Sequence, residues 1–317
     1  MGERAGPSGA GSISLESLRG DRRRRRRERY VRNAFFSAAS LSILISALIV
    51  LSLASGAFDF LTKIDGLGDL WNPRGWFPRR GLFDVLTIFL GTAMIAVVAI
   101  VVAAPIGLGA ALYLSEYARP RWRRRLKPIL EILAGIPSVV MGFFALTFIS
   151  PNVVQTLVPG APAFNIAAAG IGVGILIIPL VATVAEDAMH AVPASLREAS
   201  FGLGSKRRTT SLRVVFPAAV SGIVAALILG LSRAIGETLV VSIAAGAVGG
   251  SDRTIDIFSP GQTMTAAMTA LATGSDQVRG VDAAYPSLFF VGLLLFTITL
   301  LLNVASERFV RKVRKRY

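Results

Sequence analysis

The sequence of 317 residues contains no cysteine and a single histidine, His190. Without cysteine there are no disulfides, thiolate zinc sites or iron–sulfur clusters, and one histidine cannot form a histidine metal cluster. The same two scarcities argue against Cys-His and Ser-His-Asp catalysis. The glycine-rich G-x-x-x-x-G-K-[ST] loop that cradles ATP phosphates is also missing, so we do not expect this chain to hydrolyse ATP itself, and we expect no cofactor and no metal.

Charge is scarce as well: 17% of residues are charged, against about a quarter in soluble domains. Five stretches carry no charge at all, and Pro151 and Pro159 divide the longest of them, residues 132–185. A membrane-spanning helix needs about 20 apolar residues. We therefore predict an all-α integral membrane protein with six transmembrane helices, at about 34–55, 84–114, 130–150, 164–185, 214–246 and 285–306.

The few charges are mostly basic, with 34 Lys and Arg against 19 Asp and Glu. Of these 34, 27 lie in the N-terminal tail, in residues 119–127 and 197–213, and in the C-terminal segment that starts at Arg308. Because Lys and Arg concentrate in cytoplasmic loops, this distribution predicts that both termini are cytoplasmic. The plasma membrane of a bacterium is the expected location.

The expected domain organisation follows from these segments. Residues 1–32 form an Arg-rich tail that we expect to be disordered and to anchor to anionic head groups, rather than to bind nucleic acid. Residues 33–83 hold the first helix and an extracytoplasmic segment, and residues 84–310 hold the main transmembrane domain with a cytoplasmic loop at 186–213. Residues 311–317 form a basic tail. A further short helix is expected within residues 262–273, at the membrane interface.

The loop at 186–213 carries a helix-start pattern, because Ser195 and Glu198 have the spacing of a capping box. We expect a short helix over 195–204 that presents Leu196 and Leu203 on one face and directs Arg197 away. Gly204 would adopt the left-handed cap. An isolated helix of this length is unstable in water, so it docks either on its own bundle or on a partner protein.

Arg233 and Glu237 lie inside the predicted fifth span, where an arginine costs about 2.5–3.5 kcal/mol. At a spacing of four residues they would share a helix face. They could form a buried ion pair that holds two subunits together. Alternatively, Arg233 handles an anion in a transport pathway while Glu237 competes for it and Thr238 adds a hydrogen bond.

The loop resembles a known family. Glu198, Ala199 and Gly204, followed by Val214-x-Phe216-Pro217, are similar to the E-A-A-x-x-x-G motif of the membrane subunits of ABC importers. The resemblance implies the type I importer fold. It also implies that 195–204 is a coupling helix, in which Glu198, Ala199 and Gly204 contact an ATP-hydrolysing subunit.

Longer stretches resemble the phosphate-uptake ABC permeases, namely 131–142, 230–238 and 287–303. The segment around Trp71-Asn72-Pro73 is similar to the C-type subunit of that family. The resemblance implies a non-catalytic permease of a high-affinity phosphate importer, together with an A-type permease, two ATP-binding subunits and an extracytoplasmic phosphate-binding protein. The alternatives are the A-type subunit, a permease for molybdate, sulfate or phosphonate, a proton-coupled secondary transporter and a membrane enzyme that acts on lipid phosphates.

Overall fold

The computed structural model describes residues 22–246, 253, 255–273 and 282–314. The chain divides into two units after Ser52, and the first unit comprises the N-terminal part of one long helix, α2 (Arg22–Lys63). Its large apolar side chains, including Phe35 and Phe36, are exposed, as expected for a helix that faces lipid. α2 begins at Arg22, within the region expected to be a disordered tail, and residues 1–21 lie outside the described part.

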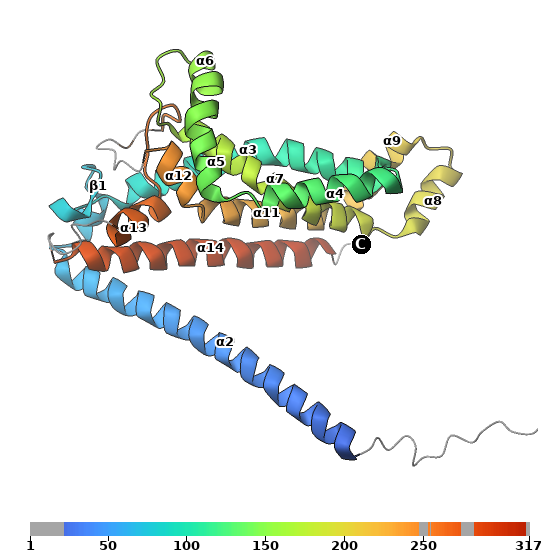
Figure 1. The fold of residues 1–317 in the computed structure, drawn as a ribbon, viewed down its shortest axis with the longest axis horizontal. Helices are drawn as coiled ribbons and strands as arrows, with labels where there is room; N and C mark the ends of the chain where they lie inside the picture. The colour runs from blue at the N-terminus through green and yellow to red at the C-terminus, as the bar shows by residue number, and fades with distance from the viewer. Residues whose placement is uncertain (1–21, 247–252, 254, 274–281, 315–317) are drawn as a thin grey trace, which may run out of the picture. The chain divides into compact units, whose positions relative to one another are not determined.

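The second unit is a bundle of long helices with short connecting elements (Figure 1). Its longest helices are α3 (Val85–Leu112), α7 (Ile166–His190), α11 (Val220–Ile235) and α14 (Ala284–Arg314). Around them lie α4 (Pro120–Ala134), α5 (Ser138–Phe144), α6 (Gln155–Leu157), α8 (Ala194–Gly202), α9 (Arg207–Thr210), α10 (Phe216–Ala218), α12 (Leu239–Ala244) and α13 (Met264–Thr273). Three wider π-helical turns are η3 (Tyr113–Tyr117), η4 (Ala145–Val154) and η5 (Ser211–Val215).

The segment between α2 and α3 contains a small hairpin that the sequence did not predict. Strands β1 (Trp76–Phe77) and β2 (Leu82–Phe83) pair antiparallel, with Trp76 opposite Phe83. The 3-10 turn η2 (Pro78–Arg80) joins the two strands, and a second 3-10 turn, η1 (Leu67–Trp71), precedes them. The Phe83 ring packs edge-on against Phe60, with 5.0 Å between ring centroids. The hairpin thereby closes one end of the bundle with aromatic side chains.

Small residues set the packing of α3 against α7. A Cβ atom on Gly170 would lie 2.6 Å from Cβ of Val98, and one on Gly174 would lie 2.9 Å from Cβ of Val102. In lipid, close backbone approach at small residues is a main source of helix association. Asn165 is the N-cap of α7, and its side chain accepts a hydrogen bond of 2.7 Å from the backbone N–H of Ala168.

The predicted fold class is confirmed, but two of the predicted spans are not single helices. Five helices have the length and composition to cross a membrane, or six if the pair 207–218 and 220–235, bent by 70°, counts as one. The predicted span 130–150 is divided between α4 and α5, because Pro137 disfavours helix at the residue before it. The predicted span 214–246 bends at Ala219 and breaks again at Gly236.

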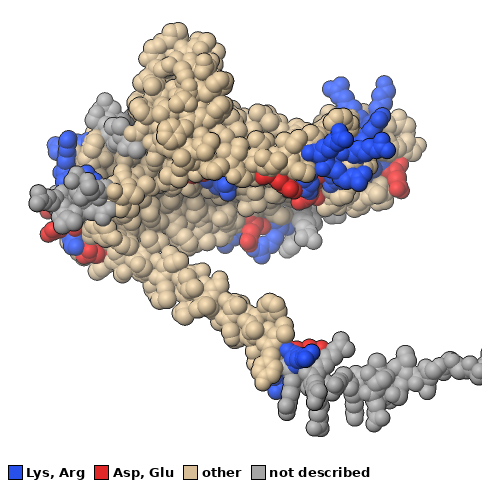
Figure 2. Space-filling view, viewed as in Figure 1, with Lys and Arg blue, Asp and Glu red and all other residues tan. Residues whose placement is uncertain are grey.

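One shorter element agrees with the sequence-based prediction. The predicted short helix near 262–273 is confirmed as α13, and α3 continues through Pro105. Figure 1 shows the segment from α5 to α6 rising steeply from the long helices. Figure 2 shows Lys and Arg gathered over α4 and α9, at one end of the bundle.

Gly91 on α3 offers a test of this packing, because a Cβ there would lie 2.2 Å from the backbone oxygen of Gln262. We expect Gly91→Ala to destabilise the chain by about 1–3 kcal/mol, since backbone cannot yield as a flexible side chain can. The matched control is Gly109→Ala on the same helix, where a Cβ would meet nothing within 4 Å. Thermal unfolding of the detergent-purified variants checks this, and equal melting temperatures would contradict it.

Candidate functional site

Arg233 and Glu237 lie on either side of a helix end. Arg233 is in the last turn of α11, which ends at Ile235, and α12 begins only at Leu239. The expectation that the two side chains share one helix face is therefore wrong: Gly236 interrupts the helix between them. Among the described ion pairs none joins Arg233 to Glu237. The Glu237 carboxylate instead accepts a hydrogen bond of 3.3 Å from the backbone N–H of Thr238.

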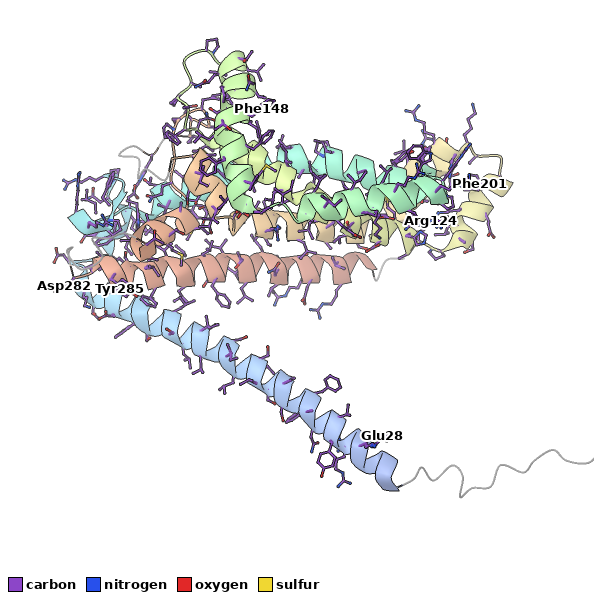
Figure 3. The ribbon with its side chains drawn as sticks, in the orientation of Figure 1. Glu28, Arg124, Phe148, Phe201, Asp282 and Tyr285 are labelled. Atoms are coloured by element: carbon purple, nitrogen blue, oxygen red, sulfur yellow. The ribbon has the colours of Figure 1, made fainter. Side chains whose placement is uncertain are left out.

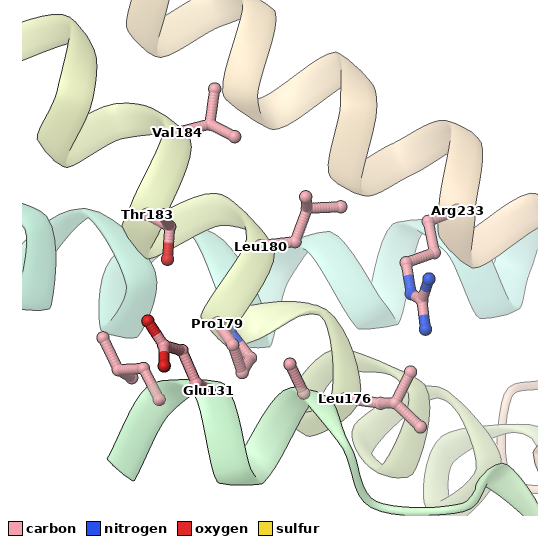
Figure 4. Close-up of a pocket in the computed structure, with 9 residues that line it drawn as sticks. Glu131, Leu176, Pro179, Leu180, Thr183, Val184 and Arg233 are labelled. Carbon is pink, nitrogen blue, oxygen red and sulfur yellow. The ribbon is translucent and has the colours of Figure 1, made fainter. Parts of the chain in front are cut away.

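Arg233 instead lines a pocket of about 280 Å³ between α4, α7 and α11 (Figure 4). Glu131 on α4 and Thr183 on α7 are the other polar side chains in its wall. The remaining lining is apolar: Leu130, Ala134, Leu176, Pro179, Leu180 and Val184. The acidic residue that shares the pocket with Arg233 is thus Glu131, which sequence reasoning did not single out.

The pocket's chemistry suits an anion. A guanidinium presents parallel N–H donors that match two oxygens of a carboxylate or phosphate-like group. Apolar walls lower the local dielectric constant and so strengthen that attraction. Thr183 can add a hydroxyl donor, whereas Glu131, when ionised, can only accept hydrogen bonds. Thr238 lies beside the break, where its hydroxyl is 3.3 Å from the carbonyl oxygen of Gly236.

The short helix predicted over 195–204 is present as α8, although it starts differently. Its N-cap is Pro193 and no side-chain capping bond is formed, so the predicted capping box between Ser195 and Glu198 is wrong. Pro193 has φ −56° and ψ 137°, and the helix begins directly after it. Ser195 is consequently already inside the helix rather than at its cap.

The end of α8 agrees with prediction. Gly204 has φ +77°, the left-handed conformation, and its backbone N–H donates to the carbonyl oxygen of Phe201 at 2.9 Å. The N–H of Ser205 reaches back to the carbonyl oxygen of Ser200 at 3.1 Å. These two bonds complete a glycine-capped helix end of the Schellman type.

One face of α8 is open to the surroundings. Glu198, Ala199 and Gly204 are exposed, as are Leu196, Phe201 and Leu203, the last at 88%. Phe201 lies at the outer end of this loop (Figure 3). An exposed cluster of large apolar side chains beside a carboxylate is typical of a protein-binding surface.

Arg197 turns inward, contrary to the expectation that it points away. Its Nη2 lies 2.9 Å from Oε1 of Glu116 and also donates to the carbonyl oxygen of Met189 at 2.8 Å. Its Nη1 donates to the carbonyl oxygen of Val192 at 2.6 Å. The signal that could have suggested this is Glu116, an acidic residue at the end of a long apolar span.

A second buried carboxylate, Glu186, joins α7 to α4. The Nη2 atom of Arg123 lies 2.6 Å from Oε1 of Glu186, and Nζ of Lys127 lies 3.8 Å from Oε2. Glu186 is fully buried, and the two cations offset part of the cost of removing its carboxylate from water. Two of the basic residues counted as orientation signals therefore also hold helices together.

Asp84, the N-cap of α3, forms a third ion pair between a buried carboxylate and a basic side chain. Arg253 binds both carboxylate oxygens of Asp84 at 2.9 Å and also donates to the carbonyl oxygen of Trp71. Burial raises the pKa of Asp84, but the hydrogen bonds from Arg253 and Thr87 and the charge of Arg253 outweigh it. The pKa of Asp84 is therefore lowered below its ordinary value of 3.8.

The long apolar helices define the class of protein, a multi-pass membrane protein, and an arginine-lined pocket and an exposed surface helix are its most distinctive features. Residues 103–315 match the family described as the inner membrane component of binding-protein-dependent transport systems. This chain belongs to that family.

The similar proteins span most of the chain. The probable ABC transporter permease protein YqgH of Bacillus subtilis is 31% identical over 301 residues, 89% of this chain and 92% of the relative. The phosphate transport system permease protein PstC 1 of Mycobacterium tuberculosis is 32% identical over 275 residues, 77% of this chain and 80% of the relative. A bacterial ABC transporter that imports alginate has the same fold, with a TM-score of 0.59 at 15% identity, over 91% of this chain and 99% of that one.

The contact between Asp84 and Arg253 generates a pH prediction. Because the folded-state pKa of Asp84 is lowered, its ionisation stabilises the fold fully above pH 3.8, and this contribution is lost as the pH falls through the folded-state pKa. We expect Asp84→Asn to lower the melting temperature at pH 7, and the gap to the wild type to shrink below about pH 4. Asp65→Asn, at an exposed position, is the control. A gap that persists unchanged at pH 3 would contradict this prediction.

Proposed function

We propose that this chain is the C-type permease subunit of an ATP-driven importer of inorganic phosphate and forms half of the translocation pathway. The observation that carries the proposal is the exposed Arg233 guanidinium, which lines an otherwise mostly apolar pocket between membrane helices. The relatives named as phosphate permeases support the choice of anion, because they match this chain over about four-fifths of its length.

Arg233 acts in this proposal as a transient anion site. An arginine inside a membrane span is costly enough that it normally serves a pathway or a charge partner. Glu131 shares the pocket, so its carboxylate can attract the guanidinium when no anion is bound and thereby limit how tightly the anion is held. Glu237 and Thr238 at the adjoining helix break remain candidate pathway residues. The break gives the backbone there the freedom to adjust as the pathway opens.

The assembly that we infer places a second, A-type permease beside this chain. Two ATP-binding subunits on the cytoplasmic side complete the membrane complex, and an extracytoplasmic phosphate-binding protein delivers the substrate. The exposed face of α8, with Glu198, Ala199 and Gly204, docks on an ATP-binding subunit. Both termini are cytoplasmic, because Lys and Arg crowd the end of the bundle that carries α4, α8 and α9 (Figure 2).

The rival hypotheses have less support. A proton relay between Arg233 and Glu237 needs the two groups in contact, and the end of α11 separates them. Permeases for molybdate, sulfate or phosphonate would use the same guanidinium chemistry. Competition by these anions against labelled phosphate uptake distinguishes them.

Arg233 provides the direct test of the pathway. In the assembled transporter, Arg233→Ala should lower labelled phosphate uptake at least tenfold, because the pocket loses its anion donor, and Arg233→Lys should retain part of the activity. Arg213→Ala removes an exposed arginine from the cytoplasmic loop and should leave uptake unchanged. Wild-type uptake by Arg233→Ala in an assembled complex would contradict the pathway role.

The docking face of α8 is tested separately. Glu198→Lys reverses an exposed charge, and Gly204→Ala puts a side chain at φ +77°, which costs about 1–2 kcal/mol. We expect both to reduce co-purification of the ATP-binding subunits or the stimulation of ATP hydrolysis by the loaded binding protein. Gly202→Ala lies inside the helix with open space around it and serves as control. Normal assembly and normal stimulation in both variants would exclude this docking site.

A further inference from the structure

α3 carries a buried carboxylate at each end. Asp84 is its N-cap and is fully buried, and Glu116 lies in η3, which continues the helix, with 8% exposure. Each is bound by an arginine far away in the sequence, Arg253 and Arg197 respectively. A membrane helix that is tied by buried ion pairs at both ends is positioned by the segments that supply the arginines.

The contact with Arg197 is the more extensive of the two. Three acceptors surround the guanidinium: the Glu116 carboxylate, the carbonyl oxygen of Met189 in the last turn of α7, and that of Val192 just after this helix. The hydroxyl of Ser115 donates to the same Glu116 carboxylate at 3.0 Å. The planar guanidinium holds α8, α7 and η3 in one geometry, and a lysine could not reproduce it.

Other links between the loop and the bundle are weaker. The hydroxyls of Ser200 and Thr210 lie 2.9 Å apart, but this pair connects α8 only to α9. The Arg207 guanidinium lies 5.4 Å from the ring centroid of Tyr117, which adds a second contact between the loop and η3. Arg197 and Arg207 therefore both connect the loop to η3, at the C-terminal end of α3.

Buried ion pairs of this kind are weak evidence for stability, because desolvation offsets much of the attraction. Their defined effect is geometric: a bidentate or multiply bonded arginine fixes one arrangement of the elements it joins. α3 itself can carry a displacement along its length, since its glycine contacts with α7 keep the two helices packed together.

We propose that α3 is the strut that transmits movement of α8 to the opposite end of the bundle, and that Arg197 and Glu116 are the positioning residues through which α8 moves it. The proposal rests on the proposed docking of α8 on an ATP-binding subunit. Arg197 lies directly before the docking residues Glu198 and Ala199 but faces the other way, so one short helix contacts the partner on one side and α3 on the other.

The experiment uses the complete transporter in nanodiscs, with hydrolysis measured without and with phosphate-loaded binding protein. Arg197→Gln and Glu116→Gln should each lower the ratio of stimulated to basal hydrolysis at least fivefold while the subunits still co-purify. The double variant should be no worse than either single one, because both remove the same contact. Arg197→Lys should be intermediate. Arg124→Gln, an exposed arginine on α4, should keep the wild-type ratio.

A wild-type ratio in either glutamine variant overturns the proposal, as does a double variant whose loss is the product of the two single losses. A second measurement follows the contact between Arg197 and Glu116 through a distance between α8 and η3. Because the chain contains no cysteine, Tyr113→Cys and Ser195→Cys introduce its only two thiols, and spin labels attach to the chain at these two exposed positions. Arg197→Gln should broaden the distance distribution between them, and an unchanged distribution also overturns the proposal. A wild-type complex that binding protein fails to stimulate would contradict the proposed function instead.

Discussion

The close approach of α3 to α7 is the constraint on which the rest of the second unit depends. Lipid is as apolar as a leucine side chain, so burial of apolar surface does not drive these helices together, and contact at small residues has to do so. Gly170 and Gly174 admit Val98 and Val102, and Gly107 admits Val181 from the opposite direction. The shared surface is long and leaves the two helices little freedom to slide.

This rigid pair explains where the charged groups lie. The pocket with Arg233 forms on the side of α7 that faces α4 and α11, and the buried carboxylates lie at the ends of α3 and α7. Among the described residues, each buried carboxylate (Asp84, Glu116 and Glu186) has a basic partner, as expected because an unpaired ion in the bilayer is costly. The same bundle therefore carries both the pocket with Arg233 and, at one end, the exposed helix α8.

The sequence predicts the membrane class and the left-handed cap at Gly204, since both depend on local composition. It does not predict the breaks at Gly135 and Gly236, because a helix end inside an apolar stretch depends on what packs around it. The sequence also predicted the wrong direction for Arg197, which was expected to face outward. Its acceptor Glu116 is 81 residues away, and helical periodicity says nothing about such distant partners.

A reversible crosslink between α3 and α7 tests the central claim, that the two helices move as one unit. Gly107→Cys and Val181→Cys allow a disulfide between the helices after a shift of a few tenths of an ångström, since a Cβ on Gly107 would lie 3.1 Å from Cβ of Val181 and disulfides have Cβ atoms about 3.5–4.5 Å apart. Phosphate uptake by the reconstituted transporter is then measured before oxidation, after oxidation and after reduction. The account predicts that the crosslinked transporter keeps the uptake of its reduced form. Loss of uptake on oxidation, with recovery on reduction, would contradict it.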